Sequence, residues 1–164
     1  MNWYLIVKFL HILAVTLTIG GMFARQLVRG YAKKSDDLNV IITLSRVAVR
    51  IDRILVIPWS NMMIAMGIVL AVMQNWPIFG FLQGASQNWL LVSNLLLVVM
   101  LVLIPAIFLP HSQKLEALFQ PALIEGHITS ELRAALEDPR NKIAHYVEET
   151  IVLVVAALMV LKPF

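Results

Sequence analysis

A long central stretch of this chain, residues 54–113, contains no Asp, Glu, Lys or Arg. Soluble domains carry charge on about a quarter of their residues, whereas this chain is 14% charged and 60% apolar. A backbone in hydrocarbon must satisfy its own hydrogen bonds, so the stretch predicts two helices of roughly 20 residues each. Residues 74–87 are its more polar part and would form the turn. The stretch therefore predicts a helical hairpin that crosses a membrane twice.

Two further apolar segments flank this hairpin. The first covers residues 3–24, and the second, which is shorter and less apolar, covers residues 146–161. Together with the hairpin helices at residues 54–73 and 88–110, they predict four spans. The expected fold class is all-α, a four-helix transmembrane bundle that forms one domain over residues 1–164.

The distribution of positive charge predicts how the bundle is oriented. Seven Lys and Arg residues lie between Arg25 and Arg53, four lie between Lys114 and Lys142, and none lies in residues 74–87. Cytoplasmic loops are enriched in Lys and Arg, so both charged loops are expected in the cytoplasm and both termini outside. The first span is not expected to be a signal peptide, because most of its positive charge follows the apolar run. The net charge of +3 reflects this asymmetry, and no nucleic-acid partner is expected.

In the first charged loop, apolar residues recur with helical spacing over residues 38–53, which predicts an amphipathic helix there. Ser35-Asp36-Asp37 offers N-capping oxygens for this helix, and Pro58 is expected to kink it where it enters the bilayer. Two hypotheses account for the arginines on one face of the helix: an anchor for anionic lipid headgroups, or a site for an anionic ligand such as a haem propionate. The arginines on this face are Arg46, Arg50 and Arg53.

The second charged loop predicts two short amphipathic helices, at residues 112–119 and 130–137. Pro121 is expected to end the first helix, and Asp138-Pro139 the second. Their apolar residues should lie on the membrane surface or pack under the bundle. These residues include Leu115, Leu118, Leu132 and Leu136.

His11 is the ionisable residue placed deepest in the first span, where such residues are costly and often functional. Lys8 lies nearer the outer surface, where its side chain can extend to water. One hypothesis for His11 is a neutral imidazole bonded to an intramembrane polar side chain, with Asn61, Ser93 and Asn94 as the candidates. The other is an axial haem ligand. The other histidines lie at or beyond the cytoplasmic edge, and cysteine is absent, so no second histidine ligand and no thiolate site is expected.

The fourth span predicts a belt of ion pairs at the cytoplasmic edge. Its uncharged part, residues 150–161, is only about 18 Å long as a helix, against a hydrocarbon core of about 30 Å. Extending it backward brings Glu148 and Glu149 to the edge of the hydrocarbon, where unpaired carboxylates are costly. Asp52 and His145 are candidate further members of this belt. The expected partners of the carboxylates are four arginines of the first two helices: Arg25, Arg29, Arg50 and Arg53.

Several short motifs resemble a bacterial family of predicted integral membrane proteins of unknown function. They are Trp3-Tyr4 with Lys8-Phe9-Leu10-His11, Gly20-Gly21, Ile57-Pro58, Asn88-Trp89-Leu90 and the terminal Leu161-Lys162-Pro163. The layout is also distantly similar to HemJ-type protoporphyrinogen oxidases and CopD-like membrane domains. In the HemJ type a histidine of the first span is implicated in haem binding, and His11 matches its position. The HemJ lysine early in the third span corresponds here to Ser93.

This resemblance implies a multi-pass protein of the bacterial inner membrane that binds haem b or a related tetrapyrrole and acts in redox chemistry. His11 would ligate the iron, and basic residues would hold the acidic groups of the cofactor: Arg25, Arg29, Arg50 and Arg53. The alternative hypothesis is an accessory or scaffold subunit of a larger membrane complex, or a homo-oligomer, whose polar residues only fix helix packing. A small transporter or copper-handling protein is a third hypothesis, and the chain shows no clear inverted repeat to support it.

Overall fold

The computed structural model describes residues 2–163, and every regular element in them is helical. The long helices are α1 (Trp3–Lys34), α3 (Ile57–Met73), α4 (Trp89–Leu103) and α7 (Pro139–Leu161). At the charged end of the molecule lie α2 (Leu38–Ile51), α5 (Leu109–Glu125) and α6 (Ser130–Leu136). The turns η1 (Asp52–Val56) and η3 (Ile104–Phe108) are π-helical, and η2 (Gly80–Gln83) is a 3₁₀ turn.

Four continuous helical stretches are long and apolar enough to cross a membrane, which confirms the expected fold class. They extend past the apolar spans, because α1 continues to Lys34 and the second stretch already begins at Leu38. Helix α2 is capped as expected, since the Asp37 side chain accepts bonds from the backbone N–H groups of Asn39 and Val40.

The expected break at Pro121 is wrong, because α5 passes through this residue and ends at Glu125. Proline removes one backbone donor, but tertiary packing holds this part of the helix in place. Phe119 and Ala122, on either side of Pro121, are buried in a small core together with Ile41 of α2 and Leu132 of α6. The loop helices thus pack together under the bundle. Each fully buried Leu, Ile or Phe contributes about 1.5–3 kcal/mol to the stability of this packing, relative to an exposed position.

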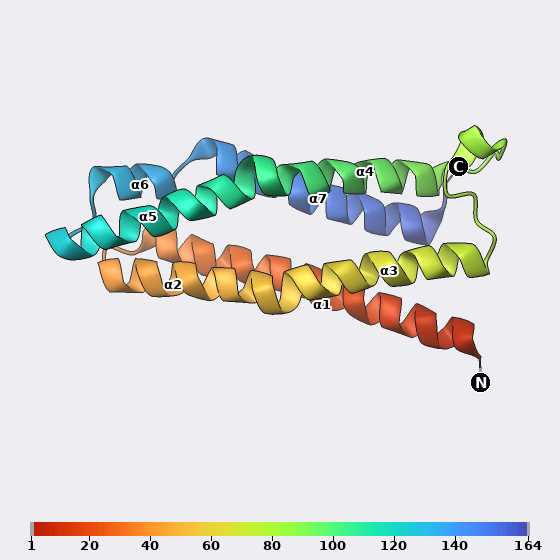
Figure 1. Ribbon diagram of the computed structural model, residues 1–164, viewed down its shortest axis with the longest axis horizontal. Coiled ribbons are helices and arrows are strands. Elements are labelled where there is room, and N and C mark those ends of the chain that lie inside the picture. The colour runs from red at the N-terminus through yellow and green to blue at the C-terminus, as the bar shows by residue number, and fades with distance from the viewer. Residues whose placement is uncertain (1, 164) are drawn as a thin grey trace.

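The helices form two halves, as Figure 1 shows. In the first half α1 packs against α2 and α3, and in the second α4 packs against α7 and α5 against α6. Helices α2 and α5 connect the halves at the charged end. Helix α1 begins and α7 ends at the opposite end of the molecule, where the segment that joins α3 to α4 also lies (Figure 1).

Two prolines accompany the π-helical turns. Pro58 is the second residue after η1, and Pro105 lies inside η3. Just before Pro58, where a kink was predicted, the chain forms one wider turn. Such turns often occur at functional sites. Here η1 begins with Asp52 and η3 ends with Phe108, and both side chains belong to the site described next.

Candidate functional site

A closed ring of polar side chains joins the two halves of the bundle, where the spans meet the charged end of the molecule. Arg25 donates to Asp52 at 2.7 Å and to Glu148 at 2.5 Å. Arg29 donates to the other oxygen of Asp52 at 3.2 Å and contacts His145 at 2.7 Å. His145 in turn lies 3.0 Å from Glu148. We call these five residues the polar ring.

The contacts of His145 assign its tautomer. An arginine can only donate, so Nε2 of His145, which faces Arg29, must be the acceptor. The proton is therefore on Nδ1 and is donated to Oε2 of Glu148. The imidazole also stacks on Phe108, with ring centroids 4.6 Å apart and planes 14° apart. The ring orientation is fixed on three sides, which suits a neutral histidine that relays a hydrogen bond from Arg29 to Glu148.

The polar ring is balanced in charge and largely shielded from water. Its two arginines offset its two carboxylates, and the side chains of Arg25 and Glu148 are only 5% and 6% exposed. Burying such charges is costly unless they are paired and hydrogen-bonded. Within residues 2–163, the Nε–H of Arg25 is a buried donor of the ring with no protein acceptor. The ring thus links α1, η1 and α7 through their side chains.

The structure brings together only part of the expected belt. Arg25, Arg29, Asp52, His145 and Glu148 meet in the polar ring. Arg50 of α2 and Arg53 of η1 are exposed, and Glu149 is half-buried on another side of α7. The ion pairs found in the described residues do not include these three: Arg50, Arg53 and Glu149. Arg46 pairs instead with the exposed Glu116 at 3.0 Å.

His11 has a backbone partner that the sequence did not predict. Its Nδ1 lies 2.9 Å from the carbonyl oxygen of Met63 on α3. A carbonyl only accepts, so Nδ1 carries the proton and Nε2 keeps its lone pair. Gly67, one turn further along α3, makes room for the imidazole, because a Cβ built there would lie 3.2 Å from Cε1 of His11. The histidine is thus held between α1 and α3 in one tautomer.

The side chains expected to bond His11 lie elsewhere. Asn61 is exposed, Ser93 bonds the carbonyl of Trp89 in its own helix at 2.8 Å, and Asn94 bonds that of Ile78 at 3.2 Å. Further along α1, the residues on one face are buried: Ala14, Thr18, Met22 and Arg25. Lys8 is exposed and lies 5.9 Å from the ring centre of Tyr4.

His11 and the polar ring are separate sites. Arg25 lies fourteen positions after His11 on α1, which corresponds to a rise of about 21 Å along the helix. A planar macrocycle ligated by His11 would not reach Arg25 or Arg29 with its carboxylates over that distance. Among the described residues, no three His, Asp or Glu side chains form a group that could hold a bare metal ion.

Replacing Glu148 by glutamine should lower the free energy of unfolding in detergent by about 2 kcal/mol or more, because Arg25 would lose a buried charged acceptor. Glu149→Gln is the matched control, since it removes the same charge from the next residue, outside the polar ring. Unfolding curves of the two variants provide the measurement. Equal losses in both would show that the ring does not hold the helices together.

Comparison with known families places the chain. A family described as "Predicted integral membrane protein (DUF2269)" matches residues 5–163. No curated protein and no solved structure matches the chain. The matched range includes His11 and all five residues of the polar ring. The chain therefore belongs to this family of predicted integral membrane proteins, DUF2269, in agreement with its four apolar helical stretches.

Proposed function

We propose that the chain binds haem b or a related tetrapyrrole through Nε2 of His11 and acts in electron transfer in the bacterial inner membrane. The observation that supports this proposal is the bond between Nδ1 of His11 and the carbonyl of Met63. Histidines that ligate metals commonly donate their other ring proton to a carbonyl or carboxylate, which fixes the tautomer and raises the basicity of the ligand. His11 has this arrangement on an apolar helix pair.

The surroundings of His11 suit an axial ligand. Gly67 lets α3 approach the imidazole closely, and both helices are mostly apolar in sequence there. A bound haem would supply one-electron chemistry, with a potential set by its axial ligand, its burial and its hydrogen bonds. The chain contributes the orientation of the imidazole and an apolar environment.

The arginines do not fit the role of partners for the acidic groups of this cofactor. Arg25 and Arg29 are engaged by Asp52 and Glu148 in the polar ring, far from His11. The lysine one turn before the histidine is the cation nearest to it along α1. We therefore assign this role to Lys8 and a structural role to the arginines of the ring.

The visible spectrum of the protein purified in mild detergent tests the proposal. After expression with added haem precursor we expect a Soret band that shifts on reduction with dithionite. His11→Ala should abolish or shift this band, because it removes the axial nitrogen. His127→Ala, at an exposed loop histidine, is the matched control and should leave the band unchanged.

A colourless preparation would overturn the haem proposal. It would favour the alternative function, an accessory or scaffold subunit. The exposed apolar surface of the spans supports this alternative. Large apolar side chains along all four stretches are exposed in the single chain, for example Phe9, Val72, Leu101 and Val160. Lipid or neighbouring subunits can cover such a surface. A band that persists unchanged in His11→Ala would move the ligand to another residue.

A further inference from the structure

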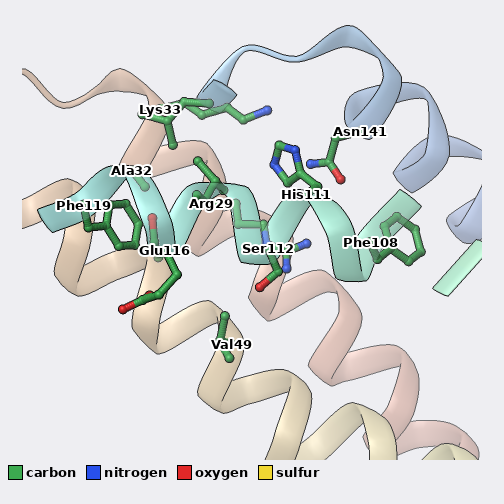
Figure 2. Close-up of a pocket in the computed structure, with 13 residues that line it drawn as sticks. Arg29, Ala32, Lys33, Val49, Phe108, His111, Ser112, Glu116, Phe119 and Asn141 are labelled. Carbon is green, nitrogen blue, oxygen red and sulfur yellow. The ribbon is translucent and has the colours of Figure 1, made fainter. Parts of the chain in front are cut away.

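A cavity of about 60 Å³ lies between the two halves of the molecule at the charged end. Residues of α1, α2, α5 and α7 line it, as Figure 2 shows. One water needs roughly 10–15 Å³ of such volume, so the cavity has room for a small polyatomic group rather than for one water. It lies next to the polar ring, with Arg29 on its wall.

The polar groups on the cavity wall are mostly hydrogen-bond donors. In Figure 2 the amide of Asn141 faces the imidazole of His111, and the Lys33 side chain extends toward the same region. Asn141 is only 5% exposed. Its side chain lines the cavity, so the amide is placed to donate to a group bound there. Ser45 and Ser112 add hydroxyl groups to the wall.

The charge of the wall is positive. The polar ring is balanced, so Arg29 brings no excess charge, whereas Lys33 is within ion-pair distance of no carboxylate in the described part of the chain. Glu137 and Asp138 attract Lys33 from further away, while Arg29 and Lys142 repel it. The acidic residue on the wall is Glu116, whose side chain is 59% exposed and already paired with Arg46.

We propose that this cavity binds a phosphate group, presented by an anionic phospholipid or by a soluble phosphate compound. A tetrahedral oxyanion accepts several hydrogen bonds at once, which matches an excess of convergent donors around one unpaired lysine. Lys33 supplies the charge, and Asn141 and Ser112 supply neutral donors. Phe108 and Phe119 add apolar surface to the wall, and Phe108 lies where the apolar span ends, a position that suits a lipid headgroup. This site is independent of His11, which lies on the same helix about 27 Å from Arg29.

Thermal unfolding in a neutral detergent tests the proposal, with three probes at equal ionic strength. The probes are inorganic phosphate, phosphatidylglycerol, and phosphatidylcholine as the zwitterionic comparison. Ligand that binds the folded state raises the midpoint temperature. Stabilisation by inorganic phosphate indicates a soluble source, and stabilisation by phosphatidylglycerol alone indicates a lipid source.

The variants Lys33→Gln and Lys34→Gln make the test specific. They remove the same charge from neighbouring residues, but only Lys33 lines the cavity, and Lys34 is exposed. Lys33→Gln should weaken the apparent affinity for the stabilising probe by about tenfold or more, and Lys34→Gln should leave it unchanged. Asn141→Ala, which keeps the charge, should also weaken it. Equal losses in both lysine variants, or no stabilisation of the wild type by either phosphate probe, would overturn the proposal.

Discussion

Replacing Arg25 by methionine is expected to lower the free energy of unfolding by about 3–5 kcal/mol, the usual cost of breaking a buried ion pair from one side. Arg25 is 4% exposed and is the only residue of the polar ring that contacts both carboxylates. Its loss leaves Glu148 with His145 alone and Asp52 with Arg29 alone. Unfolding curves in detergent, from denaturant or heat, provide the measurement.

A second substitution distinguishes the ring from general packing. In the Arg25→Met background, Glu148→Gln removes the carboxylate that has lost its partner, so its own cost should be smaller than in the wild type. Interaction energies between contacting residues are typically about 0.5–3 kcal/mol in such cycles. Arg46→Met is the control, because Arg46 and Glu116 are both more than half exposed, and exposed pairs contribute about 0–1 kcal/mol. Additive losses at Arg25 and Glu148 would contradict a shared network.

The composition of the polar ring was predictable in part from the sequence. The shortness of the fourth span required partners for its carboxylates, and the first helix carried arginines at the same depth. Glu148 and Glu149 are neighbours, however, and periodicity alone does not tell which of them faces inward. The choice between these two glutamates, and the choice between the arginines of α1 and those of α2 and η1, depend on how three helices are rotated relative to one another. That rotation is set by tertiary packing, including the extra residue in the π-helical turn at Asp52.

The environment of His11 was less predictable, for a different reason. The sequence pointed to polar side chains as partners, whereas the structure uses the backbone carbonyl of Met63. Every residue has a carbonyl, so no sequence signal marks the one that is used. Gly67 was the available clue, because a glycine inside an apolar helix often marks a close approach. The stacking partner of His145, Phe108, is likewise one aromatic residue among several in the spans.

The glycine pair of the first span shows the same limit at a single position. Gly20 and Gly21 both permit close packing by type. Successive residues point about 100° apart on a helix, so only one of them can face a given neighbour. The structure selects Gly21, which faces η1, while a Cβ at Gly20 would meet nothing within 4 Å. Close packing therefore rests on Gly21 alone.

Replacing Gly21 by alanine should cost about 1–3 kcal/mol, the range for overpacking a tight contact. An added Cβ would lie 2.9 Å from Cβ of Leu55 and 3.1 Å from Cγ2 of Val56. Rotation about χ1 can move Cγ2 of Val56, but Cβ of Leu55 is fixed by its backbone, so α1 has to move away from η1. Gly20→Ala is the control and should cause no loss.

The expected movement also affects the polar ring, because Gly21 lies one turn before Arg25 on the same face of α1 and η1 begins with Asp52. Separating these elements lengthens the 2.7 Å contact between Arg25 and Asp52. Gly21→Ala should therefore cost less in the Arg25→Met background than in the wild type, since part of its effect acts through that contact. Unfolding curves of the two single variants and the double variant measure this coupling. Fully additive losses would mean that the glycine contact and the ring stabilise the bundle independently.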